Sequence, residues 1–194
     1  MTTSAETARL DLPVGWVPPP RTGSNQEGWA DAYVAELGLE EAAAFSLHFG
    51  LLAVMNTAAA MRPGERQSYA FIEDPTTGMV RALLSVQVWR LPAAQRQVYR
   101  ERIEAENTAE GIEVINQTFE ERILAAGPAI VMHDFTVAVS EGEQPVPALE
   151  RGVVALFVEG TDAMIELSMY TQDLLLFDDM TAYLVELAEG FVPA

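Results

Sequence analysis

His133 and Asp134 are adjacent, and a histidine beside a carboxylate is a pair that could act in general acid–base catalysis. Both lie in residues 129–139, whose alternation of apolar and polar residues predicts a strand. Neighbouring residues of a strand point to opposite faces of a sheet, so these two side chains are not expected to bond each other. His133 shares its face with Val131 and Phe135, which favours a packed core or interface histidine over a catalytic one.

Metal chemistry has few candidate ligands here. The chain has two histidines and no cysteine, so a zinc site would need carboxylates from distant segments. Asp173, Asp178 and Asp179 are clustered, but we place them at the start of the last helix, where caps and the helix dipole favour acids. His48 lies in an alanine-rich segment and is expected to be either structural or a surface residue. We expect no metal and no cofactor.

The sequence lacks the residues or motifs that several other catalytic chemistries require. Without cysteine or lysine, thiolate nucleophiles, lysine Schiff bases and a P-loop lysine are excluded. No serine lies in a G-x-S-x-G context, and no G-x-G-x-x-G motif occurs. The chain is therefore predicted not to be an enzyme. A hydrolase-type enzyme that uses only Asp, Glu, His, Arg or Tyr is the third-ranked hypothesis.

The charge is strongly acidic and uneven. The formal net charge is −18, with 11 basic and 29 acidic residues, and every basic residue is arginine. Residues 123–194 carry 1 arginine and 12 acids, whereas residues 61–122 carry 8 and 10. Phosphate backbones and anionic membranes repel such a surface, so we expect neither nucleic acid nor membrane as a partner. A protein partner with a basic patch is expected to meet the C-terminal part.

Length and composition predict a single soluble domain over residues 1–194, with residues 1–8 frayed. The N-terminus lacks the basic and apolar regions of a signal peptide, which predicts a cytoplasmic protein. Residues 42–61 carry no charge and are long enough to span a membrane. They also hold several polar residues and many alanines, so a buried helix is the better interpretation.

Periodicity predicts an α+β fold: a mostly antiparallel sheet of about six strands between helices, with the C-terminal helix packed across the sheet. A short edge strand is expected at residues 9–16, and longer strands at residues 67–73, 79–91, 112–123, 129–139, 152–159 and 163–171. Val114 and Ile115 are expected at the apolar centre of the 112–123 strand, and the 152–159 strand, which is apolar on both faces, is expected to be central. Helices are expected at residues 29–37, 39–61, 93–110 and 173–189, with Gly190 as the C′ residue of the last. Residues expected to share one face are Phe45, Phe49, Leu52, Asn56 and Ala59 in the second helix and the apolar stripe Val98, Tyr99 and Ile103 in the third. In the last strand, Glu166 and Ser168 are expected to face outward.

The two ends of the chain resemble PsbP-like α/β/α sandwich proteins. Pro13-Val14-Gly15-Trp16 is similar to the P-x-G-W entry of that family, over about the first 20 residues. The last 45 or so, with FVEG, MIELSMYT and QDLLLFDDMTAYLVELAEGF, resemble its closing hairpin and final helix. The resemblance implies a non-enzymatic scaffold that binds partner proteins, and it transfers no site residues.

The leading hypothesis is a soluble binding, adaptor or chaperone-like protein that uses a sheet edge or the 42–61 helix, with a homodimer as a further option. The alternative is a pocket for a small hydrophobic ligand between the sheet and that helix. Methionines could line an adaptable groove, although core packing is the simpler interpretation, and the same holds for the tryptophans as ligand contacts. These residues are Met55, Met61, Met79, Met132, Met164, Met169 and Met180, with Trp16, Trp29 and Trp89.

Overall fold

The computed structural model describes residues 12–20, 25–60, 66–106, 112–138 and 148–190. The strands are β1 (Trp16–Val17), β2 (Arg66–Phe71), β3 (Ala82–Arg90), β4 (Ile112–Leu124), β5 (Gly127–Ala138), β6 (Leu149–Phe157) and β7 (Ala163–Thr171). The helices are α1 (Gln26–Leu37), α2 (Glu41–Ala60), α3 (Arg96–Glu106) and α4 (Met180–Glu189), with the 3₁₀ helices η1 (Pro75–Thr77) and η2 (Ala93–Gln95).

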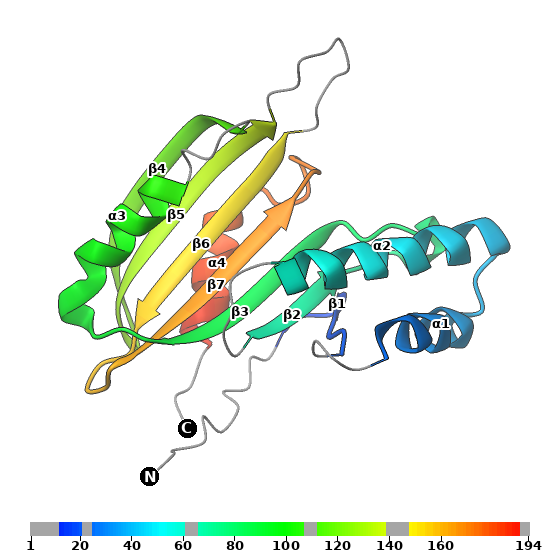
Figure 1. The fold of residues 1–194 in the computed structure, drawn as a ribbon, viewed down its shortest axis with the longest axis horizontal. Coiled ribbons are helices and arrows are strands. Elements are labelled where there is room, and N and C mark those ends of the chain that lie inside the picture. The colour runs from blue at the N-terminus through cyan, green and yellow to red at the C-terminus, as the bar shows by residue number, and fades with distance from the viewer. Residues whose placement is uncertain (1–11, 21–24, 61–65, 107–111, 139–147, 191–194) are drawn as a thin grey trace.

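All the described strands join one antiparallel sheet in the order β1-β2-β3-β7-β6-β5-β4 (Figure 1). The predicted α+β class is therefore confirmed. The sheet has seven strands, so the expected number of about six was too low. The C-terminal hairpin β6–β7 lies at the centre of the sheet, which explains why β6 is apolar on both faces.

Helices cover both faces of the sheet. On one face α4 packs over β6 and its neighbours, where Leu184 is fully buried with Val154 and Leu167. Gly152 makes this approach possible, because a Cβ there would lie 2.8 Å from the Leu184 side chain. On the other face α3 buries Tyr99 and Ile103 against β5 and β6, while α2 packs on β2 (Figure 1).

The last helix begins later than its pattern indicates. It was predicted from residue 173, but α4 starts at Met180, with Asp179 as its N-cap accepting a hydrogen bond from the Ala182 N–H at 2.8 Å. Asp173 therefore does not lie at the start of the helix. Residues 173–179 form a connector instead, since the carboxylate of Asp173 bonds Arg81 rather than a helix terminus. Gly190 follows the last residue of α4 directly, and its φ of −71° is right-handed.

Three smaller expectations also need correction. Of the strand predicted at residues 9–16, the part at 12–15 is not paired in the sheet, with a turn at 14–15, and pairing begins only at Trp16; residues 9–11 lie outside the described part. Val98 was assigned to the apolar stripe of α3, but it is 60% exposed. Ile115 was expected at the apolar centre of β4, yet a register shift between Val114 and Asn116 leaves it 61% exposed.

The helix pair α1–α2 follows the sequence closely. Asn25 caps α1 by accepting a hydrogen bond from the Gly28 N–H at 3.0 Å. Gly38 ends the helix in the left-handed conformation at φ 61°, the position where glycine is the favoured C-terminal cap. α2 then runs for 20 residues. Glu41 is its first residue, and no Asp, Glu, Lys or Arg follows in the helix.

Candidate functional site

One side of α2 is packed into the protein. Leu47, Leu51 and Met55 are spaced four residues apart, and they are 0–3% exposed. They pack with Ala70 and Ile72 of the β2 region and with buried residues of α1. The space between α2 and the sheet is therefore apolar, and the protein's own side chains fill it.

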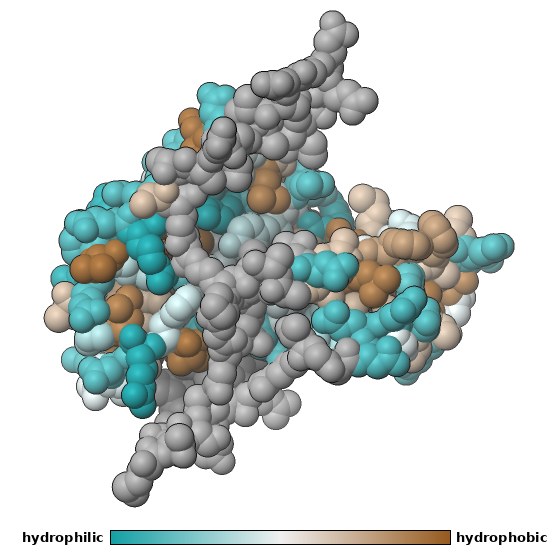
Figure 2. Space-filling model, in the orientation of Figure 1, coloured by the Kyte–Doolittle hydropathy of each residue, from teal (hydrophilic) through white to brown (hydrophobic). Residues whose placement is uncertain are grey.

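The opposite side of α2 is apolar and exposed. Phe45 is 67% exposed and Phe49 is 53% exposed, with their ring centroids 4.6 Å apart. Ala42 and Ala53 are exposed on the same side, one turn before and one turn after the two rings. We call Ala42, Phe45, Phe49 and Ala53 the outer face of α2. Figure 2 shows apolar surface gathered over this end of the molecule.

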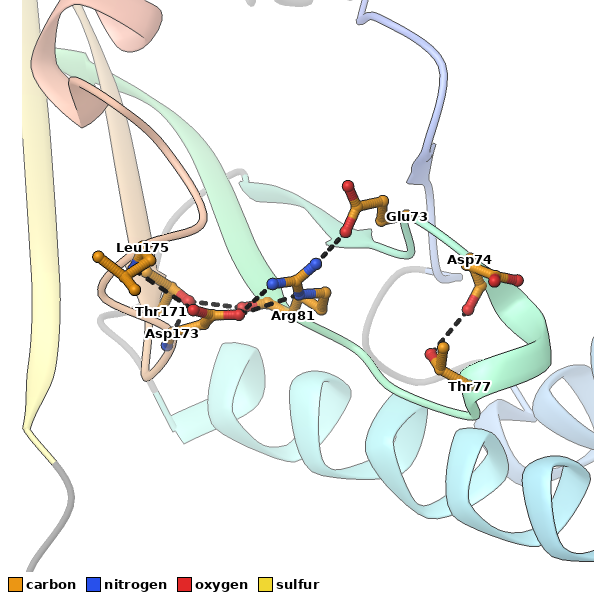
Figure 3. Close-up of polar contacts among 7 residues, drawn as sticks. All are labelled: Glu73, Asp74, Thr77, Arg81, Thr171, Asp173 and Leu175. Atoms are coloured by element: carbon orange, nitrogen blue, oxygen red, sulfur yellow. Dashed lines mark hydrogen bonds and ion pairs between the residues drawn. The ribbon is translucent and has the colours of Figure 1, made fainter.

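The loop that carries η1 packs against α2. Gly78 lies so close to α2 that a Cβ there would be 2.6 Å from the carbonyl oxygen of Ala43. The next residue, Met79, is 56% exposed. Asp74 shapes this loop by accepting hydrogen bonds from the Thr76 N–H and Oγ1 at 2.9 and 2.7 Å. Asp74 and Thr77 are drawn beside α2 in Figure 3.

Acidic residues lie along one border of the outer face. No arginine or lysine occurs between residues 22 and 61, which hold five acids: Glu27, Asp31, Glu36, Glu40 and Glu41. Asp31 of α1 is 68% exposed, and its Oδ1 lies 3.0 Å from Nδ1 of His48. The ring of His48 in turn lies edge-on to that of Phe49, which places Asp31 at the border of the outer face. His48 is therefore a contact between the two helices, as its structural interpretation predicted.

A second polar arrangement lies on the sheet between α2 and α3. Glu166 accepts hydrogen bonds from the Tyr99 hydroxyl at 2.8 Å and the Ser168 hydroxyl at 3.0 Å. Its Oε2 also lies 3.9 Å from Nη2 of Arg102, whose guanidinium stacks on Tyr99. Ser168 is only 4% exposed, so the expectation that Glu166 and Ser168 face solvent was wrong. These contacts occupy the carboxylate and hold α3 on the sheet.

His133 and Asp134 do point to opposite faces, as strand geometry predicts. Asp134 is fully buried and forms a two-point ion pair with Arg151, whose Nε lies 3.1 Å from its Oδ1. His133 lies on the α4 face, where its Nε2 is 2.8 Å from Oε1 of Glu150. Glu166 and His133 therefore lie on different sides of the sheet, and the structure does not bring them together.

The Arg81 cluster ties two distant loops together. Arg81 bonds Asp173 through Nε at 3.1 Å and through Nη2, and its Nη1 bonds Glu73 (Figure 3). The hydrogen bond from Arg81 lowers the pKa of Asp173 more than any other contact. Thr171 donates its hydroxyl to the Arg81 carbonyl at 2.6 Å and accepts from the Asp173 N–H. This arrangement fixes the connector before α4.

Asp173, Asp178 and Asp179 do not form a metal site within the described part of the chain, where no group of three or more histidine or acidic side chains could hold an ion. Asp179 works as a helix cap. The hydrogen bond from the Ala182 N–H is the largest of the effects that lower its pKa. Most of the methionines pack in the core, as expected, and Met79 is the exposed exception; Met61 lies outside the described residues.

An open depression of about 460 Å³ lies at the start of α3, lined by Ala93, Ala94, Arg96, Gln97 and Glu121. It lies beyond the end of β3 that is far from α2, and three of its five lining residues are polar (Figure 1). It does not match the apolar pocket between the sheet and residues 42–61 that the ligand hypothesis expects.

Comparison with models of known protein families found no match, and comparison with the curated proteins found none either. The resemblance to PsbP-like proteins stays a prediction. In the part of the chain that the structure covers, no helix is long and apolar enough to cross a membrane.

The outer face of α2 was not foreseen as a site. Phe45 and Phe49 were grouped with Leu52 and Asn56 on one side of a buried helix, but the buried series is Leu47 and its partners. Both series repeat at helical spacing and both are apolar. The sequence did contain one signal for an exposed apolar surface, namely a helix that is apolar on two sides in a strongly acidic chain.

Proposed function

We propose that this protein is a non-catalytic protein-binding module, and that the outer face of α2 is its binding surface. The observation that carries the proposal is the exposure of Phe45 and Phe49 beside a core-packed side of the same helix. A phenylalanine normally buries most of its surface, and two adjacent exposed rings favour a contact with another molecule.

The size of the surface supports a protein contact. With Met79 on the neighbouring loop, the two rings expose about 300–350 Å² of apolar side chain, which is within the range of the largest apolar patch of a typical monomer, a patch that is often functional. Aromatic and methionine side chains are also the residue types enriched at the centre of protein interfaces. Phe45 and Phe49 are the natural anchors of such a contact.

The ligand-binding alternative lacks this support. The space between the sheet and α2 is occupied by Leu47, Leu51 and Met55, which pack on Ala70 and Ile72. An enzymatic role also gains little, since Glu166 and Asp134 are held by hydrogen bonds to neighbouring side chains. Neither arrangement leaves a polar group directed into a cleft among the described residues.

The test compares proteins captured by the full chain with those captured by the variant Phe45→Ser/Phe49→Ser. Ile123→Ser is the matched control, because Ile123 is 82% exposed on β4, away from α2. We expect specific partners to be lost from the double variant and retained by the control, with unchanged circular dichroism for both. A double variant that retains every partner of the original chain would count against the proposal.

A further inference from the structure

We infer that the partner of the outer face is an amphipathic α-helix whose apolar stripe is flanked by arginine or lysine. The inference rests on the proposed function and adds the chemistry of the partner. Two features of the described residues carry it: the shape of the apolar surface and the sign of the charges around it.

The apolar surface is a stripe along a helix. Ala42 to Ala53 covers 12 residues of α2, which is about 16–18 Å at a rise of 1.5 Å per residue. Phe45 and Phe49 form ridges in the middle, and Ala42, Ser46 and Ala53 are small. Large side chains of a partner helix can enter beside the rings, as ridges enter grooves in helix packing. About three turns of partner helix would cover the stripe.

A strand is a poorer fit than a helix at this position. The backbone donors and acceptors inside α2 are already used by its own helical hydrogen bonds, so an added strand would find no partners there. A partner can therefore contact α2 at this position only through side chains. A helix can present such side chains with its own backbone satisfied.

The charges select a basic partner. The outer face is bordered by Asp31 on the α1 side and by Glu41 one turn before Phe45. Basic residues flanking the partner's apolar stripe would meet these acids across the rim.

A second copy of this chain fits less well. Two outer faces brought together would place Asp31 and Glu41 against identical acids, in a pair of molecules that each carry a net charge of −18. Like charges opposed at an interface oppose binding and also slow association. The rim therefore disfavours the homodimer at this surface.

The test uses three synthetic helical peptides with one common leucine stripe, flanked by arginine, glutamine or glutamate. Each is titrated against the full-length protein, with fluorescence anisotropy as the readout. We expect the arginine-flanked peptide to bind tightest and the glutamate-flanked peptide weakest. The affinity of the arginine-flanked peptide is expected to fall as the salt concentration rises. Salt screens exposed charges that lie farther apart than the Debye length, which is about 10 Å at 0.1 M.

Two matched triple variants locate the electrostatic contribution. Glu27→Gln/Asp31→Asn/Glu41→Gln removes the two acids that border the outer face together with Glu27, which is exposed one turn before Asp31 on the same side of α1. A control removes three exposed acids elsewhere, with Glu113→Gln/Glu159→Gln/Glu189→Gln. The first variant is expected to weaken the arginine-flanked peptide about tenfold, and the control by less than about twofold.

The outcomes separate this inference from the function it rests on. If Phe45→Ser/Phe49→Ser abolishes binding but the three peptides bind equally, or both triple variants weaken binding alike, the basic helix is overturned and the binding surface stands. If no peptide binds at about 1 mM, the helical partner is overturned. If the double serine variant binds as the original chain does, the surface itself is overturned. Partition of the protein onto phosphatidylcholine vesicles that requires Phe45 would replace the protein partner with a lipid surface.

Discussion

The packed and exposed sides of α2 can be distinguished by two single substitutions, Leu47→Ala and Phe45→Ala. Leu47 is 0% exposed, and removing its side chain costs about 2–5 kcal/mol, because a cavity remains where the leucine packed. Phe45 is 67% exposed and loses mainly its contact with the ring of Phe49, worth about 0.5–1.5 kcal/mol. The better helix propensity of alanine offsets about 0.5 kcal/mol of that loss.

Thermal unfolding followed by circular dichroism measures the contrast. For a chain of this size each kcal/mol lowers the Tm by roughly 2–4 °C, so Leu47→Ala should lower it by about 5–20 °C. Phe45→Ala should change the Tm by less than about 4 °C. If Phe45→Ala destabilised the protein as much as Leu47→Ala, Phe45 would belong to the core and the assignment of the outer face would be refuted.

Three further predictions concern the interior and the turns. Asp134→Ala should destabilise the protein by about 3–5 kcal/mol in urea unfolding, and replacing Asp134 and Arg151 together by leucine and methionine should cost less, because no buried charge is left without its counter-charge. Asp179→Ala should lower the free energy of unfolding by about 1 kcal/mol at pH 7. Because the folded pKa of Asp179 lies below its usual 3.8, this difference in stability should shrink as the pH falls below 3.8, and a difference that does not change with pH would contradict the prediction. Gly78→Ala should lower the Tm more than Gly160→Ala, since both glycines have positive φ but only Gly78 touches the backbone of α2; equal losses would speak against that contact.

Elements bounded by strong local signals could be predicted from the sequence. β7 has the residues that its alternation indicates, and α1 ends at Gly38, where a left-handed cap stops the helix. The central position of β6 follows from its apolar residues on both faces, because such a strand must be covered on both sides. Local patterning was sufficient in each of these cases.

Features that depend on tertiary contacts could not be predicted. The helical spacing of Phe177 and Met180 suggested one helix from residue 173, but the contact between Asp173 and Arg81 holds that segment as a connector. Glu166 looked solvent-exposed because it alternates with apolar residues, whereas α3 returns over the sheet and bonds it through Tyr99.

The candidate site also depends on tertiary contacts and could not be predicted from local pattern. α2 is apolar on two sides, and periodicity alone cannot say which side faces the sheet. The packing of Leu47 and Leu51 against β2 decides it, and the exposure of Phe45 and Phe49 follows. The acids of this region were visible in the sequence, but only the packing of α1 alongside α2 places Asp31 at the border of the outer face.

The most direct test of the binding surface is site-specific photocrosslinking in the cells that produce the protein. A benzophenone side chain is introduced at Phe49 on the outer face, or at Ile123 on β4 as the control. We predict a discrete adduct with a partner protein from position 49 but not from position 123, and loss of that adduct when Phe45→Ser is added. Identical adducts from both positions, or an adduct from position 49 that Phe45→Ser does not change, would contradict the proposed binding surface.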